Sequence, residues 1–268
     1  MIDIAKISDS VPVGNGYIGE DGLLHCKNCD GALETYINVP LRGERKVRCI
    51  CECMRKERDA AEERAKAEKI DRNRRICFDG SEMMHCTFET SRDSEYLTMA
   101  KNYVKNFDEF RKAGKGLLLY GDVGTGKSHI AACIANALLS DEKSVLMTNF
   151  TTIINKLQNG FEGRQEYINS LNRYTLLIID DLGTERRSEY MQENVYNIID
   201  ARYRSGLPMI ITTNLTVEEL KKPTEIGNLR IYDRILEKCH PIAVKGQSIR
   251  RQNLRNDFKA TEKLLKGV

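Results

Sequence analysis

Two adjacent carboxylates, Asp180 and Asp181, follow the aliphatic run 176–179 in the stretch "LLIIDDLG". Four consecutive apolar residues indicate a strand that is buried on both faces, as in a parallel sheet. The acids then lie at the carboxyl end of this strand, where open α/β sheets bind their ligands. Because neighbouring carboxylates repel each other, the pair indicates a bound cation. The alternative is that an aspartate caps the next helix, which accounts for one acid better than for two.

The stretch "GDVGTGKS", residues 121–128, is a candidate ligand site that needs such a cation. It matches the phosphate-loop pattern G-x-x-x-x-G-K-[ST], and it lies between the apolar run "LLLY" and a helical pattern, as that motif requires. Glycines let the backbone point N–H groups at phosphate, and the helix adds its positive N-terminal dipole. The alternative is a glycine-rich turn that carries lysine and serine by chance. The predicted cofactor-binding residues are Gly121, Asp122, Val123, Gly124, Thr125, Gly126, Lys127, Ser128 and Asp180.

Each polar side chain of this set has an expected role. We expect Lys127 to bridge the β- and γ-phosphates and the Ser128 hydroxyl to bind Mg²⁺. Asp180 is the expected Mg²⁺ carboxylate, directly or through a water. Asp181 is expected to face the water that attacks the γ-phosphate, as a base or as the group that orients it. Asn214, which ends the run "MIITTN", is placed to reach the γ-phosphate or that water, although asparagine is also common in turns.

Two arginine pairs lie further along the chain. Arg230 and Arg234, in "RIYDRILEK", are four residues apart and therefore share one helical face. An arginine offered to the γ-phosphate of a neighbouring subunit acts as a finger. Arg250 and Arg251 begin the last predicted helix, after the final strand. Solvent exposure is the alternative for both pairs.

Five of the nine cysteines lie between residues 26 and 53, as the motif "CKNC" and the cluster "CICEC". Zn²⁺ prefers four soft ligands in a tetrahedron, and a C-x-x-C motif supplies two of them at a suitable separation. The cluster offers three thiols for the other two ligand positions. The alternative to a zinc site is a set of free thiols in a loose loop. Four protein ligands leave no open position, so the predicted role is structural. The candidate ligands are Cys26, Cys29, Cys49, Cys51 and Cys53.

The element pattern divides the 268-residue chain into three parts. From about residue 88, the runs "GLLLYG", "SVLMTN", "LLIID", "MIITTN" and "PIAV" alternate with helical stretches, which predicts an α/β fold with a doubly wound parallel sheet. The segment before it mixes charges of both signs with alanines and offers a helix no face to bury. We therefore predict a zinc-binding module at 1–53, a charged helical linker at 54–87 and a nucleotide-binding domain at 88–268.

Composition excludes some classes of protein. The formal net charge of +3 gives by itself no argument for nucleic acid, so any basic surface must be local. No apolar run has the length of a membrane span, and the first residues, "MIDIAKISDS", lack the pattern of a signal peptide. We expect a cytoplasmic protein without a membrane partner.

In their order and spacing, the motifs resemble those of an AAA+ ATPase. More closely, "LLIIDDLG", "IITTNL", "YDRI" and "GQSIRR", behind a cysteine module and a charged linker, are similar to the DnaC/DnaI-type helicase loaders of bacteria and phages. The resemblance implies a five-stranded parallel sheet in the order 5-1-4-3-2, ATP with Mg²⁺, and a hexameric replicative helicase as partner. The catalytic residues that it implies are Lys127, Asp181 as the water-activating acid, Asn214 as first sensor, Arg234 as finger and Arg250 as second sensor.

The same resemblance favours Cys51 and Cys53 as zinc ligands, with Cys49 as the spare, and a zinc module that binds the helicase. It implies an oligomeric ATP switch that loads the helicase onto single-stranded DNA and self-associates through Arg234. Basic residues in "KLQNGFEGR" could contact that DNA beside an aromatic ring, and the alternative is a solvated loop. The basic residues are Lys156 and Arg164, and the aromatic ring is that of Phe161.

Two features depart from the AAA+ pattern. AAA+ proteins generally carry glutamate where Asp181 stands, so we expect slow hydrolysis that a partner or DNA stimulates. Only about two dozen residues follow the last predicted strand, which implies a reduced C-terminal lid. Two other functions stay open: an IstB-type transposition helper, and a zinc-containing adaptor whose nucleotide site is structural.

Overall fold

The computed structural model of the protein describes residues 16–89, 91, 94–158, 163–183, 189–223, 226–246, 248, 258, 261–262 and 265–266. The chain divides into two compact units, Met1–Lys69 and Ile70–Val268, and each is described by itself. The sequence-based boundaries at residues 53 and 87 stay a prediction. None of the helices in the described residues is both long enough and apolar enough to cross a membrane.

The N-terminal unit contains two small antiparallel hairpins. Strands β1 (Gly16–Ile18) and β2 (Leu24–Cys26) form the first, and β3 (Glu34–Val39) and β4 (Gly43–Arg48) form the second. Among the residues that the structure describes, the core between them consists of three buried side chains, Cys26, Leu33 and Cys51. A core of this size cannot hold so short a segment folded, so the unit needs a covalent or metal crosslink.

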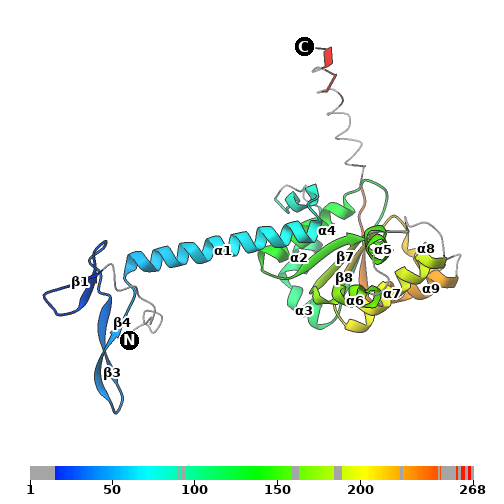
Figure 1. Ribbon diagram of the computed structural model, residues 1–268. Helices are drawn as coiled ribbons and strands as arrows, with labels where there is room; N and C mark the ends of the chain where they lie inside the picture. Colours follow the sequence, from blue (N-terminus) through cyan, green and yellow to red (C-terminus); the bar gives the residue numbers. More distant parts are fainter. Residues whose placement is uncertain are drawn as a thin grey trace. The chain divides into compact units, whose positions relative to one another are not determined.

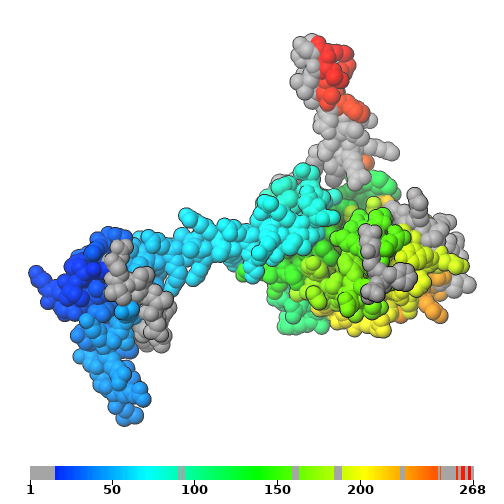
Figure 2. Space-filling view, viewed as in Figure 1, coloured from blue at the N-terminus to red at the C-terminus, as the bar shows by residue number. Residues whose placement is uncertain are grey.

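The charged segment after these hairpins forms one helix, α1 (Glu52–Phe78). Its buried residues are confined to its last two positions, Cys77 and Phe78. The polar side chains form ion pairs four residues apart, such as Lys56 with Glu52 and Arg75 with Asp71. Figure 2 shows the side chains of this helix, in cyan, at the molecular surface. A helix of this kind is stabilised by propensity and surface pairs, because it has no apolar stripe to bury.

The C-terminal unit is built on a five-stranded parallel sheet (Figure 1). Its strands are β5 (Gly116–Tyr120), β6 (Val145–Asn149), β7 (Leu176–Leu182), β8 (Met209–Thr213) and β9 (Cys239–Ala243). They lie in the order β6-β7-β8-β5-β9. Read from the other edge, this is the predicted order 5-1-4-3-2, which is therefore confirmed. The chain passes from β5 across the sheet to β6, and β8 returns to lie beside β5, so β7 and β8 have strands on both sides.

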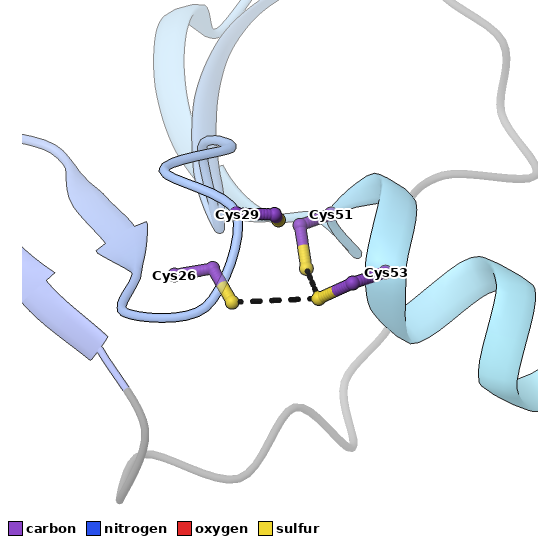
Figure 3. A group of neighbouring side chains, drawn as sticks. All are labelled: Cys26, Cys29, Cys51 and Cys53. Carbon is purple, nitrogen blue, oxygen red and sulfur yellow. Dashed lines mark hydrogen bonds between the residues drawn. The ribbon is translucent and has the colours of Figure 1, made fainter.

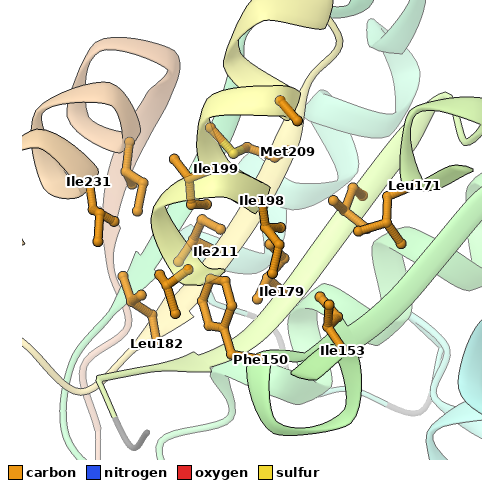
Figure 4. Close-up of a cluster of buried hydrophobic side chains, with 14 of the residues drawn as sticks. Phe150, Ile153, Leu171, Ile179, Leu182, Ile198, Ile199, Met209, Ile211 and Ile231 are labelled. Atoms are coloured by element: carbon orange, nitrogen blue, oxygen red, sulfur yellow. The ribbon is translucent and has the colours of Figure 1, made fainter. Parts of the chain in front are cut away.

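Helices cover both faces of this sheet. The helical elements are η3 (Glu82–His85), α2 (Glu95–Lys105), α3 (Phe107–Lys112), α4 (Lys127–Ser140), α5 (Phe150–Gln158), α6 (Arg164–Ser170), η4 (Leu171–Arg173), α7 (Glu189–Ser205), α8 (Val217–Lys221) and α9 (Ile226–Lys238). Alternate residues of each strand enter two separate cores. Leu177 and Ile179 of β7 pack with α5, α7 and α9 (Figure 4). Leu176 and Ile178 pack with α2 and α4 on the opposite face. Burial on both faces explains why these strands read as continuous aliphatic runs.

A buried arginine fixes the amino ends of the two central strands. Arg202, in the last turn of α7, is 1% exposed, and burial lowers the pKa of its guanidinium to about 10. It donates hydrogen bonds of 2.7 to 3.4 Å to four carbonyl oxygens, those of Leu171, Tyr174, Thr175 and Pro208. These carbonyls lie just before β7 and β8, so Arg202 sets the positions at which both strands enter the sheet.

Replacing Arg202 with methionine is expected to lower the free energy of unfolding by about 2–5 kcal/mol, because the four carbonyl oxygens then lose the hydrogen bonds that the guanidinium donates. Urea unfolding followed by circular dichroism measures the change. Arg204→Met, two residues along the same helix, is the matched control, because its side chain is 71% exposed and pairs with Asp200 at the surface. The control is expected to stay within about 0.5 kcal/mol of the parent chain. Equal losses in both variants would contradict the role given to Arg202.

Candidate functional site

The phosphate-loop segment lies between β5 and α4, with its glycines in conformations that other residues rarely adopt. Gly121, Gly124 and Gly126 have φ angles of 142°, 84° and 102°. A Cβ on Gly121 would lie 2.5 Å from the carbonyl oxygen of Val244, and one on Gly124 would lie 2.2 Å from the Ser248 hydroxyl. The loop therefore needs glycine both for its turns and for its close approach to the chain that follows β9.

Lys127 extends back over this loop and is 6% exposed. Its Nζ donates 2.8 Å hydrogen bonds to the carbonyl oxygens of Gly121 and Asp122 and to Oδ1 of Asn214. The loop is closed further by the Thr125 hydroxyl, which donates to the Asp122 carbonyl oxygen at 2.9 Å. The lysine charge is thus held at the mouth of the loop, and the predicted sensor Asn214 lies directly against it.

The two acids lie inside β7, which continues to Leu182 beyond the predicted end of the aliphatic run. Asp180 still pairs in register with Asn149 of β6, whereas the pairing of β7 with β8 shifts between Ile179 and Leu182. Asp181 is the residue that takes up this shift, with a φ of 63° and an exposed side chain. Because both acids are part of the strand, which continues to Leu182, neither has the position of a helix cap.

A buried threonine of β8 connects both acids, and the sequence interpretation missed it. The Thr212 hydroxyl donates to Asp180 Oδ1 at 2.6 Å and accepts from the Asp181 backbone N–H at 2.9 Å. The sequence signal for it was the polar end of an otherwise aliphatic strand, "MIITTN". A threonine in such a strand does not by itself indicate whether its hydroxyl faces a carboxylate or a backbone group.

The predicted nucleotide-site residues therefore meet at one edge of the sheet. Strand β8 lies between β5 and β7, so its carboxyl end contacts the loop through Asn214 and the acids through Thr212. The hydroxyl of Ser128, at the start of α4, and the carboxylate of Asp180 are the hard oxygen ligands that Mg²⁺ takes. The main-chain N–H groups at the start of α4 suit a phosphate group.

The two arginines of α9 differ in their surroundings. Arg230 is exposed, whereas the Arg234 side chain is 23% exposed and forms a 2.7 Å ion pair with Asp200 of α7. Arg234 also donates to the Tyr196 hydroxyl at 3.1 Å and lies over the Tyr196 and Tyr203 rings, 4.7 and 5.6 Å from their centroids. Within its own chain, Arg234 thus joins α9 to α7.

The remaining predicted positions are placed only in part. Arg250 and Phe161 lie outside the described residues. Lys156 is exposed on α5. Arg164 lies over the Tyr190 ring, 5.5 Å from its centroid, and donates to the Asn194 side chain, so it packs against α7. These contacts give DNA binding at this loop no support beyond the sequence pattern.

In the N-terminal unit, four of the five clustered cysteines come together. The thiols of Cys26, Cys29, Cys51 and Cys53 all lie within 4.8 Å of one another (Figure 3). The Cys26–Cys53 and Cys51–Cys53 sulfur pairs are 3.6 and 3.2 Å apart, close to the roughly 3.8 Å that a tetrahedron with 2.3 Å Zn–S bonds requires. Cys49 instead donates to the Ala32 carbonyl oxygen at 3.3 Å. This geometry fits a structural zinc ion held by four thiolates.

The local backbone favours the thiolate form of the first two cysteines. The N–H groups of Asn28 and Cys29 lower the pKa of the Cys26 thiol, and those of Cys53 and Gly31 lower the pKa of Cys29 to about 6. Burial raises the pKa of Cys51, and the hydrogen bond with Cys51 raises that of Cys53. His25 is not in the thiol cluster, because its ring nitrogens bond to Asp21 and to the Asp30 carbonyl.

The sequence of this chain is similar to a known protein family and to characterised proteins. A model of the family described as IstB-like ATP binding protein matches residues 63–257. The replicative helicase loader DnaC of Escherichia coli K12 is 32% identical over 160 residues, which are 56% of this chain and 63% of the relative. The replicative helicase loader DnaI of Bacillus subtilis 168 is 29% identical over 161 residues, 56% of this chain and 51% of the relative. The chain therefore spans between half and two thirds of the length of these relatives.

Solved structures show a similar fold. The crystal structure of the DnaC helicase loader superposes with a TM-score of 0.52 and 22% identity over 61% of this chain and 98% of that one. The crystal structure of DnaI gives a TM-score of 0.51 and 23% identity over 62% of this chain and 92% of that one. At this level of identity, both likenesses show the fold alone.

Proposed function

Since the chain belongs to the family of IstB-like ATP binding proteins, we propose that it is an ATP-dependent loader of a hexameric replicative DNA helicase onto single-stranded DNA. The observation that carries the proposal is the contact of Lys127 Nζ with Asn214, which directly follows β8, the strand whose Thr212 donates a hydrogen bond to Asp180. This arrangement lets one strand respond to the nucleotide phosphates and to the metal carboxylate together. The names of the DnaC and DnaI relatives supply the helicase as the client.

In this proposal, the loop 121–128 holds ATP through its backbone N–H groups. Lys127 neutralises the β- and γ-phosphates, and Ser128 and Asp180 hold Mg²⁺, which supplies electrostatic stabilisation of the transferred phosphoryl group. Asp181, exposed beside this set, orients or deprotonates the attacking water. Asn214 senses the γ-phosphate. The carboxylate of aspartate is one methylene shorter than that of glutamate, so hydrolysis is slow until a partner or DNA stimulates it.

The resemblance to helicase loaders implies roles for Arg234 and Arg250, and we assign self-association to Arg234. Arg234 acts as a finger only if it leaves the Asp200 ion pair that it forms within its own chain. Contact with a neighbouring subunit is therefore in competition with the α7–α9 contact, and this couples oligomer formation to the packing of α9. In the same proposal, Arg250 is the second sensor, the role that the resemblance to AAA+ ATPases implies for it.

We assign the zinc module to binding the helicase. Its four thiols are all used as ligands, so it has no open metal position for catalysis. A small module beside a charged linker suits a protein partner, and the cysteine module also favours a loader over an IstB-type transposition helper. An adaptor with a structural nucleotide site is the second alternative. Absence of phosphate release with DNA and helicase present would favour that adaptor.

The test is capture of the purified replicative helicase of the encoding organism by the tagged full chain, with ATP and Mg²⁺, with ADP, or without nucleotide. We expect capture in every condition and transfer of the helicase to single-stranded DNA only with ATP. Asp181→Asn, which keeps ATP but loses the acid, is expected to capture the helicase and to retain it. A chain that binds ATP yet captures no replicative helicase would contradict the loader function.

A further inference from the structure

Thr212 is an unusual residue for the centre of a parallel sheet. It is 0% exposed and lies in β8, which has a strand on either side. The two residues before it, Ile210 and Ile211, are part of the two apolar cores. A hydroxyl buried at such a position is costly unless both its donor and its acceptor functions are used.

Both functions of this hydroxyl are directed at the acidic pair. Its proton is donated to Asp180 Oδ1 at 2.6 Å, and its oxygen accepts the Asp181 N–H at 2.9 Å. An ionised carboxylate can only accept a hydrogen bond and a backbone N–H can only donate one, so the hydroxyl proton is directed at Asp180 and a lone pair of the oxygen at Asp181. An O–H···O⁻ bond of this length is of the strong, charge-assisted kind.

The bond to Asp180 determines which oxygen remains for a metal. Oδ1 accepts the threonine hydroxyl, whereas within the described residues no hydrogen bond reaches Oδ2. The carboxylate is therefore held in one orientation, with Oδ2 available to a cation or to its bound water. Without the hydroxyl, rotation about the Cβ–Cγ bond of Asp180 would exchange the two oxygens.

The bond to Asp181 supports a strained backbone. The φ of 63° lies in the left-handed region, which costs about 1–3 kcal/mol for a residue with a side chain. This conformation occurs where the pairing of β7 with β8 shifts, so the N–H of Asp181 meets the Thr212 side chain. The same hydroxyl thus helps to set the direction of the second carboxylate.

We propose that Thr212 is a positioning residue that orients both carboxylates of the magnesium and water site through its single hydroxyl. The inference rests on the proposed ATP hydrolysis and deepens it. Thr212 does not touch the nucleotide; it acts through Asp180 and Asp181.

Three substitutions test the hydroxyl separately from the shape of the side chain. Thr212→Val keeps the shape and removes the hydroxyl, whereas Thr212→Ser keeps the hydroxyl and removes the methyl group. Thr213→Val is the matched control, because Thr213 is equally buried but its hydroxyl bonds to the Leu182 carbonyl oxygen and to the Leu215 N–H. The readouts are kcat, the affinity for a fluorescent ATP analogue with Mg²⁺ and with EDTA, and the thermal unfolding temperature.

We expect T212V to lower kcat by about tenfold to a hundredfold, as the loss of a buried hydrogen bond to a charged group implies. It should weaken analogue binding with Mg²⁺ and leave binding in EDTA unchanged. T212S and T213V should stay within about threefold of the parent chain, whatever their unfolding temperatures.

A folded T212V with parental kcat and parental Mg²⁺-dependent affinity would overturn the inference, and so would a T212S as impaired as T212V. If T212V does not fold, T212S alone decides the matter, because impaired Mg²⁺-dependent binding in a chain that keeps the hydroxyl contradicts the role. A parent chain that neither binds nor hydrolyses ATP would overturn the proposed function and this inference with it. A parent chain that is active beside an unaffected T212V overturns this inference alone.

Discussion

Lys127→Ala is expected to weaken ATP binding by about thirtyfold to several thousandfold, the range for truncating one partner of a buried, hydrogen-bonded charge pair. The lysine is 6% exposed, and its Nζ lies 2.8 Å from two loop carbonyl oxygens and from Asn214. The alanine variant loses the charge that we propose to face the β- and γ-phosphates, together with the amine that joins the loop to Asn214. Anisotropy of a fluorescent ATP analogue measures the affinity, and phosphate release measures the accompanying loss of hydrolysis.

The matched control for this variant is Lys112→Ala. That lysine lies on α3 with a side chain that is 72% exposed, and it forms a surface ion pair with Glu109. The Lys112→Ala variant removes the same charge. Its ATP affinity should stay within about twofold of that of the parent chain, because exposed charges away from the site are screened. The Lys127 variant should still contain zinc and capture the helicase, since both belong to the other unit. If it binds ATP as tightly as the parent chain does, the nucleotide lies elsewhere.

The sheet could be predicted from the sequence because its three inner strands, β5, β7 and β8, are buried on both faces. Such strands read as unbroken aliphatic runs, and their alternation with helical stretches defines a doubly wound sheet. The place of the loop 121–128 between β5 and α4 could be predicted because its pattern has glycine at fixed positions, and the structure gives the three glycines of the loop positive φ angles. For Gly121 and Gly124 the close contacts with Val244 and Ser248 add a second reason for glycine, which a local pattern cannot contain.

The contacts of Thr212 and Arg234 could not be predicted, because each depends on which strands and helices become neighbours. The hydroxyl of Thr212 meets Asp180 only because β8 returns to pair with β7. Spacing placed Arg230 and Arg234 on one helical face, but it could not indicate that Asp200 binds only the second. Likewise, the backbone shift at Asp181 arises from the pairing of two strands and leaves no trace in the composition of either.

Cys29→Ser is expected to reduce the zinc content from one ion per chain to none at micromolar free zinc. Serine keeps the size of the side chain but replaces a thiolate with a weak oxygen ligand. Because the core in the described part of this unit has three buried side chains, the free energy of metal binding is largely the free energy of folding. We therefore expect residues 16–53 to become sensitive to protease and helicase capture to fail. Zinc content by mass spectrometry and limited proteolysis measure the two effects.

Cys49→Ser separates zinc ligation from the mere presence of cysteines in the cluster. Cys49 is 8% exposed and two residues from Cys51, yet its thiol is directed at the Ala32 carbonyl oxygen. A serine hydroxyl can donate the same hydrogen bond, so this variant should keep its zinc and its helicase. ATP binding should be unchanged in the Cys29→Ser and Cys49→Ser variants, because the C-terminal unit has its own two apolar cores. Zinc lost equally from both variants would mean that the ligand set differs from the four thiols that the fold brings together. Zinc retained by the Cys29 variant would mean that the unit is held by something other than a tetrahedral metal site.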